Sequence, residues 1–123
     1  MKILLVDDSG TMRAIQKRCL LKLGVSQDDV VEAENGQVAL EAYRADSFAI
    51  ILTDQNMPVM DGIDFLKNLR QLPGGDGPVV VFCTTENDVN HIQEAMEAGA
   101  NEYIMKPFDG EIIQAKFAQV GLL

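Results

Sequence analysis

Short apolar runs alternate along this chain with longer segments whose apolar residues recur every three or four positions. The short runs are typical of buried strands, and the longer segments are typical of helices with one buried face. The expected strands are residues 3–6, 30–33, 49–53, 79–83 and 103–105. Parallel neighbouring strands need crossover helices, and a sheet covered on both faces has strands that read as continuous apolar runs. The order of segments therefore predicts an α/β fold: a doubly wound, five-stranded parallel sheet with five helices.

Each expected helix has an apolar face and a recognisable end. Gly24 and Gly99 are placed to end the first and fourth helices, and the sequence PGGDGP interrupts the third, which runs over about residues 62–72. The apolar residues that define the helix faces are Met12, Ile15, Cys19, Leu20 and Leu23, then Leu40 and Tyr43, then Ile63, Leu66 and Leu69, then Val89, Ile92 and Met96, and finally Ile112, Ile113, Lys116, Phe117 and Val120.

Composition limits the classes of function. With 123 residues, 47% of them hydrophobic, the chain fits a single domain, residues 1–123, with a real core. The net charge of -9, with scattered lysines and arginines, argues against nucleic-acid or anionic-membrane binding and favours cations or basic partners. Cys19 and Cys83 lack metal-ligand spacing and are expected to be reduced thiols. We expect a cytoplasmic protein, since the first residues run directly into a strand and no apolar run would span a bilayer. We also expect a monomer.

Polar residues follow the expected strands at the point where each strand ends. Asp7 and Asp8 follow the first strand, Asp54 the third, Thr84 the fourth and Lys106 the fifth. Because ligands of open parallel sheets bind beyond the carboxyl ends of the strands, these side chains are expected to converge there. Carboxylates brought together repel one another unless a cation lies among them.

The expected cation is Mg²⁺, which prefers oxygen ligands and retains bound water. Asp8 and Asp54 suit direct coordination, Asp7 coordination through water, and a backbone carbonyl near Asn56 could add a ligand. A carboxylate such as Asp54 can attack a phosphoryl group and hold it as an aspartyl phosphate, provided that nearby positive charge offsets the negative charges.

Individually, these residues have simpler interpretations. Asp7 could be only a cap for the first helix, Lys106 only a solvated surface lysine, and Thr84 an ordinary residue at a strand end. His91, the only histidine, lies on the polar side of its helix pattern and is not expected to act in catalysis. The convergence of several such residues on one sheet edge is what favours a functional site.

The segments LLVDDSGTMR, LTDQNMPVMDG, TTE and YIMKPF resemble those of the receiver domains of two-component response regulators. The likeness covers essentially the whole chain and is strongest to single-domain, CheY-like regulators, whose fold is also described as flavodoxin-like. It implies that Asp54 is the phosphoacceptor, Thr84 the switch hydroxyl and Lys106 the phosphoryl contact. It also implies an Mg²⁺ site formed by Asp7, Asp8, Asp54 and the backbone carbonyl of Asn56, and a cis bond before Pro107.

Two positions depart from the family pattern. The strand before Thr84 is one residue longer than usual, so that Cys83 occupies the position a shorter strand would give to the switch threonine. The spacing from Thr84 to Gly99 and to Lys106 matches the family pattern and favours Thr84 as the switch threonine. Thr85 stands where a small residue is usual, which would narrow the opening to the pocket.

The resemblance also implies a route from phosphorylation to output. A histidine kinase or small phosphodonor would phosphorylate Asp54, the new charge would draw in Thr84, and Tyr103 would move from exposed to buried. The surface formed by helix four, strand five and helix five, with Val89, Ile92, Tyr103 and Pro107, would then bind an output protein such as a flagellar switch component. A phosphatase could assist the dephosphorylation of Asp54. The pathway would be chemotaxis. Such a receiver assists its own phosphorylation and dephosphorylation and is not a conventional enzyme.

Two rival functions use the same fold. An Mg²⁺-dependent phosphohydrolase with an aspartyl-phosphate intermediate commonly has a second Asp two residues after the nucleophile, where this chain has Asn56. A flavodoxin-like carrier would need a phosphate-binding loop after the first strand, where the acidic sequence DDSG has the wrong charge.

Overall fold

The computed structural model describes residues 2–85, 89–106 and 110–119 and confirms the predicted architecture. The strands are β1 (Ile3–Val6), β2 (Val30–Ala33), β3 (Ile50–Asp54), β4 (Val79–Thr84) and β5 (Glu102–Met105). The helices are α1 (Gly10–Lys22), α2 (Gly36–Ala45), α3 (Gly62–Gln71), α4 (Asn90–Glu97) and α5 (Gly110–Gln119), with a 3-10 turn at Gln27–Asp29.

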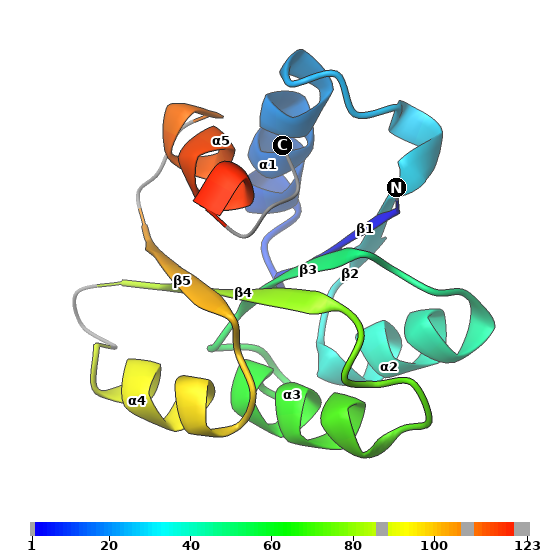
Figure 1. Ribbon diagram of the computed structural model, residues 1–123, viewed down its shortest axis with the longest axis vertical. Coiled ribbons are helices and arrows are strands. Elements are labelled where there is room, and N and C mark those ends of the chain that lie inside the picture. Colours follow the sequence, from blue (N-terminus) through cyan, green and yellow to red (C-terminus); the bar gives the residue numbers. More distant parts are fainter. Residues whose placement is uncertain (1, 86–88, 107–109, 120–123) are drawn as a thin grey trace.

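All strand pairs are parallel, in the order β2-β1-β3-β4-β5. Helices α1 and α5 cover one face of the sheet, and α2, α3 and α4 cover the other (Figure 1). The crossovers from β1 through α1 to β2 and from β3 through α3 to β4 thus lie on opposite faces, which is what makes the sheet doubly wound. The carboxyl ends of β1 and β3, which lie side by side, form the centre of one edge of the sheet.

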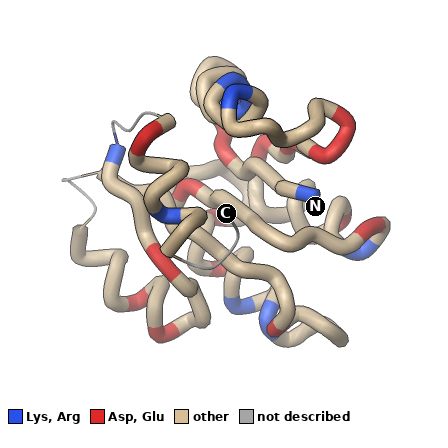
Figure 2. The backbone as a smooth tube through the Cα atoms, turned by 45° about the horizontal axis from the view of Figure 1, so that its top comes forward, with Lys and Arg blue, Asp and Glu red and all other residues tan. Residues whose placement is uncertain are grey.

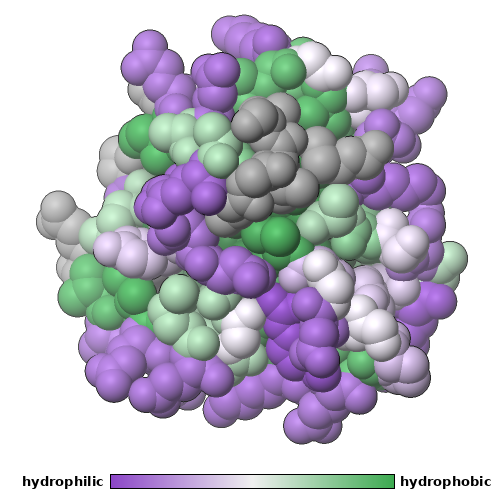
Figure 3. Space-filling model, viewed as in Figure 1, coloured by the Kyte–Doolittle hydropathy of each residue, from purple (hydrophilic) through white to green (hydrophobic). Residues whose placement is uncertain are grey.

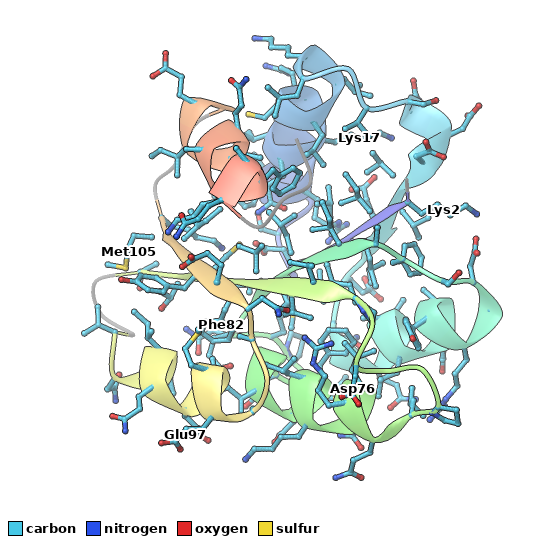
Figure 4. All side chains as sticks on the ribbon, viewed as in Figure 1. Lys2, Lys17, Asp76, Phe82, Glu97 and Met105 are labelled. Atoms are coloured by element: carbon cyan, nitrogen blue, oxygen red, sulfur yellow. The ribbon has the colours of Figure 1, made fainter. Side chains whose placement is uncertain are left out.

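The sheet separates two hydrophobic clusters. Phe65, Leu66 and Phe82 are fully buried in the larger one, on the side of α2, α3 and α4, where Figure 4 shows Phe82 between β4 and the helices below it. Ile113 and Phe117 of α5 pack with Leu20 in the other, on the side of α1. Every strand is at least partly buried, as expected for a sheet covered on both faces.

The expected helix faces are partly wrong. Ile15 is 42% exposed, whereas Gln16 is buried beside Leu20, so α1 is rotated relative to the face inferred from its apolar residues. Ser9 caps α1 by accepting a hydrogen bond from the Met12 amide, and this start, together with packing against α5, sets the orientation of the helix. The apolar residues of α1 do not define a single stripe, and periodicity therefore could not fix its orientation.

Periodicity also did not identify correctly which residues of α4 and α5 are buried. Ala95 is the buried residue of α4, while Val89 and Met96 are exposed; Ile113 is buried in α5, while its neighbour Ile112 is exposed. The small Ala95 is the residue of α4 that packs in the larger cluster, on this helix's side of the sheet. Val120 lies outside the described residues. Within the described parts of the chain, no helix has the length and apolar character needed to cross a membrane.

Candidate functional site

Three carboxylates and one ammonium group meet at the carboxyl edge of the sheet. Ligand oxygens of Asp7, Asp8 and Asp54 all lie within 4.8 Å of one another. Lys106 Nζ, arriving from the end of β5, lies 2.9 Å from Asp7 Oδ2 and 3.3 Å from Asp54 Oδ1. The convergence expected from the strand ends is therefore present, although Lys106 and Asp7 are separated by almost the whole chain.

Asp7 is the most enclosed of the three carboxylates, with a side chain only 1% exposed. Its Oδ1 accepts a hydrogen bond from the Ser9 amide at 2.9 Å, and its Oδ2 accepts one from Lys106. Its amide donates to the Ala33 carbonyl of β2. Asp7 therefore is not the cap of α1, a role that Ser9 fills; it links the turn after β1 to Lys106.

Asp54 is the last residue of β3 and lies opposite Cys83 of β4 in the strand register. Its side chain is 13% exposed, which leaves a limited approach from solvent. Burial raises the pKa of Asp54, and the neighbouring Asp7 charge raises it further, whereas the Lys106 charge acts in the opposite direction. Burial therefore penalises the charged form of Asp54, and the Lys106 ammonium, or a bound cation, would offset that penalty.

The chain after Asp54 turns back tightly onto the strand end. The Gly62 amide donates to the Gln55 carbonyl at 3.0 Å, and a Cβ at position 62 would lie 2.2 Å from the Asp54 carbonyl oxygen. Glycine is required there because no side chain would fit. The Gln55 side chain accepts a bond from the Ile63 amide, so the loop that carries Asn56 is anchored at the start of α3. Asn56 itself is exposed.

Lys106 is held by both its backbone and its side chain. Its amide donates to the Thr84 carbonyl at 2.6 Å, which places it beside the end of β4. Burial by itself would lower its pKa, but the hydrogen bond from Lys106 to Asp7 and the charge of Asp54 outweigh burial and raise the pKa. Lys106 is therefore a cation, only 13% exposed, and not the solvated surface lysine of the simpler interpretation.

Thr84 is buried at the last position of β4, one residue beyond the Cα partner of Asp54. Its hydroxyl lies 3.4 Å from the Thr85 carbonyl. Cys83, the alternative position, is buried in the cluster beside α1 and α5, and burial raises the pKa of its thiol to about 12. Cys83 is thus a core residue, and Cys19 is also unpaired, so neither thiol forms a disulfide.

The donor set of the site fits Mg²⁺. All three candidate side-chain ligands are carboxylates, and they are close enough to share one ion. Hard oxygen donors with open positions for water are the coordination that Mg²⁺ takes in proteins. Asp7 already accepts two hydrogen bonds and Asp8 is exposed, so Asp8 and Asp54 are the carboxylates best placed for direct contact with an ion.

The predicted partner face is exposed around Tyr103. The Tyr103 side chain on β5 is 37% exposed, Val89 before α4 is 50% exposed, and Ile92 is half-buried. Hydrophobic side chains on the face drawn in Figure 3 occur in separate patches among polar ones. Pro107 lies outside the described residues, as does the peptide bond that was expected to be cis.

Two residues near Tyr103 were not singled out as functional from the sequence. Lys116 Nζ of α5 lies 5.2 Å from the centre of the Tyr103 ring and 3.2 Å from Glu102 Oε1. Glu102 Oε1 also accepts a hydrogen bond from the Tyr103 amide. A cation above the ring face stabilises the outward orientation of the tyrosine. Lys116 appeared in the sequence only as one position of an amphipathic pattern, which contains no signal for this contact.

Among the described residues, the charged side chains away from the site do not form a basic face. Figure 2 shows lysines and arginines spread over several elements and interleaved with acidic residues. This distribution agrees with the low isoelectric point of about 4.4. It gives no support for a nucleic-acid surface.

Comparisons with known proteins agree with this geometry. The profile of the family described as "Response regulator receiver domain" matches residues 3–118. A chemotaxis protein CheY homologue of Campylobacter jejuni is 38% identical over 121 residues, covering 98% of this chain and 92% of the relative. Chemotaxis protein CheY-3 of Vibrio cholerae is 41% identical over 120 residues, covering 98% and 91% respectively.

Solved structures give the same result for the fold. The chemotaxis response regulator CheY4 of Vibrio cholerae superposes with a TM-score of 0.87 at 32% identity, covering 97% of each chain. These relatives are similar to this chain along nearly its whole length. The chain therefore belongs to the family of response regulator receiver domains.

Proposed function

We propose that the chain is a phosphorylation-dependent switch of a two-component system in which Asp54 accepts a phosphoryl group from a histidine kinase. The observation that carries the proposal is the cluster of Asp7, Asp8 and Asp54 with the Lys106 ammonium between two of the carboxylates. This arrangement combines a nucleophile, oxygen ligands for a cation and a mobile positive charge. Membership of the receiver family supports the same chemistry.

In the proposed transfer, an Asp54 carboxylate oxygen attacks phosphorus and the bond from phosphorus to the donor nitrogen breaks. The donor imidazole keeps the electron pair of that bond. Lys106, at 3.3 Å from Asp54, is placed to pair with a new phosphoryl oxygen and to exchange its Asp54 contact for that one. Bound Mg²⁺, held by Asp8 and Asp54 with the Asn56 carbonyl and with Asp7 through water, would offset the negative charge of the carboxylates and the phosphoryl oxygens.

The proposed readout begins at Thr84. Its hydroxyl would turn toward the phosphoryl group, and space would open for Tyr103 to move inward from its exposed position. The changed surface of α4, β5 and α5 would bind an output protein. The named relatives are chemotaxis proteins, which supports a chemotaxis target such as a flagellar switch component, in the cytoplasm, with a phosphatase as a further partner.

Intact-mass measurement after incubation with acetyl phosphate tests the chemistry. We expect the wild type to gain one phosphoryl group only when Mg²⁺ is present, and Asp54→Asn to gain none. Asp76→Asn is the matched control, since Asp76 is exposed in the loop between α3 and β4, away from the carboxyl ends of the strands (Figure 4). Absence of any Mg²⁺-dependent gain in the wild type would refute the proposal. Repeated turnover of a phosphomonoester that depends on Asp54 would favour the phosphohydrolase instead.

A further inference from the structure

Arg13, in the first turn of α1, connects three parts of the structure beside the carboxylate site. Its Nη1 donates a hydrogen bond to the backbone carbonyl of Asp7. Its Nε donates to Glu32 Oε1 of β2 at 3.1 Å, and the two side chains form an ion pair. The Arg13 side chain is 18% exposed, so its guanidinium is largely enclosed by these contacts.

The carbonyl that accepts from Arg13 belongs to the peptide unit joining Asp7 to Asp8. The other polar groups of Asp7 are held by Ala33, Ser9 and Lys106. Asp8 is different: it is exposed, and within the described residues its carboxylate has no hydrogen bond or ion pair. The direction of the Asp8 side chain therefore depends on the orientation of its backbone, and the peptide before it is the one that Arg13 holds.

We infer that Arg13 is a positioning residue for the cation site: it fixes the Asp7–Asp8 peptide and thereby keeps the Asp8 carboxylate within reach of Asp7 and Asp54. Glu32 is the anchor that holds the guanidinium against this peptide. The inference rests on the proposed function, because the Mg²⁺ site is part of it. Partners that orient the ligands of a metal without touching the ion commonly change its affinity by tenfold or more.

A purely electrostatic role and a positioning role of Arg13 predict opposite changes in Mg²⁺ affinity when the residue is replaced. Its positive charge repels a divalent cation, so removal of the charge alone would make Mg²⁺ bind more tightly. Loss of its hydrogen bond would free the Asp7–Asp8 peptide, and Mg²⁺ would then bind more weakly because Asp8 must be ordered during binding. The sign of the change in Mg²⁺ affinity therefore separates a positioning role from a purely electrostatic one.

Calorimetric titration of the full chain with MgCl₂ makes the test. We expect Arg13→Gln to bind Mg²⁺ roughly tenfold more weakly than the wild type. Arg13→Lys keeps the charge but lacks the planar fork that contacts both Asp7 and Glu32, and we expect it to be weakened as well. Arg18→Gln removes the same charge from an exposed position of α1 and is expected to leave the affinity unchanged or slightly raised.

Unchanged or tighter Mg²⁺ binding by folded Arg13→Gln would overturn the inference. Circular dichroism without Mg²⁺ establishes that each variant is folded; if Arg13→Gln is not, wild-type affinity in Arg13→Lys overturns the inference instead. The proposed function fails separately, and this inference with it, if the wild type neither binds Mg²⁺ nor becomes phosphorylated. Wild-type binding and phosphorylation with an unaffected Arg13→Gln would remove only the role of Arg13.

Discussion

Arg70, near the end of α3, holds together two loops at the edge of the sheet opposite the carboxylate site. Its Nη1 donates to the carbonyls of Gly75 and Pro78, each at 2.8 Å, in the loop before β4. Its Nη2 donates to the Gly99 carbonyl at 2.7 Å and to Asn101 Oδ1 at 3.0 Å, between α4 and β5. We expect Arg70→Met, which keeps the apolar stem and removes the guanidinium, to destabilise the protein.

The size of the expected loss in stability depends on which of the hydrogen-bond acceptors of Arg70 water can reach once the guanidinium is removed. Gly99 is half-buried and Asn101 is exposed, so their oxygens can be rehydrated, whereas Gly75 and Pro78 are buried. The loop cannot easily move to expose them, because Gly75 packs so closely that a Cβ there would lie 1.9 Å from the Leu69 carbonyl. Two lost bonds from a charged donor at about 1.5 kcal/mol each give a loss of about 3 kcal/mol. For a chain of this length that corresponds to a fall in Tm of roughly 10 °C.

Urea unfolding followed by circular dichroism, without Mg²⁺, measures this loss. Arg18→Met, at an exposed position of α1, is the control and is expected to stay within about 0.5 kcal/mol of the wild type. Because Arg70 lies away from the carboxylates, folded Arg70→Met should still gain a phosphoryl group from acetyl phosphate. A loss of less than about 1 kcal/mol would refute the reasoning, since the buried carbonyls would then have found other partners.

Two further predictions concern the site and the loop after it. Because burial raises the pKa of Asp54, the folded state holds a proton on Asp54 more tightly than the unfolded chain does, and ionised Asp54 destabilises the fold at neutral pH. Asp54→Asn should raise the free energy of unfolding at pH 7, by less than relief of the burial penalty alone would give, since the lost Lys106 contact offsets part of that relief. This gain in stability should shrink as the pH falls through the raised pKa of folded Asp54 toward the ordinary value of 3.8, because the wild type is then relieved of the buried charge by protonation. A stability difference that does not change with pH in urea titrations would contradict this prediction. Val59 has a φ of 68°, a conformation that strains a β-branched residue, and is 83% exposed. Val59→Gly should therefore raise the free energy of unfolding by about 0.5–1 kcal/mol. A lower urea midpoint for the variant would show that the backbone is not strained at this position.

The order and type of the elements could be predicted from the sequence because they depend on local patterns. The apolar runs before Asp7 and Asp54 are typical of buried strands. The strand ends observed differ from those expected by about one residue: β3 begins at Ile50 and includes Asp54, and β4 extends to Thr84. Such differences are ordinary, because hydrogen bonding to a neighbouring strand, which a single sequence does not display, determines where a strand ends.

The orientation of the helices could not be predicted to the same degree. Ile15 was expected in the core and Gln16 was not, yet the structure places them the other way round. Likewise, nothing in the sequence indicated that Arg70 would bridge two loops or that Lys116 would lie above the Tyr103 ring. These contacts join residues that are far apart along the chain, and their geometry depends on how complete helices pack.

The sequence by itself determined that Asp7, Asp8, Asp54 and Lys106 would meet, because the carboxyl ends of parallel strands share one edge whatever the details of packing. Only the tertiary structure decided how they meet. It placed Lys106 closer to Asp7 than to Asp54, enclosed Asp54 enough to raise its pKa, and left Asp8 exposed beside a peptide held by Arg13. Strand topology is encoded in local hydrophobic periodicity, whereas distances, burial and charge balance arise from contacts between distant segments after they pack.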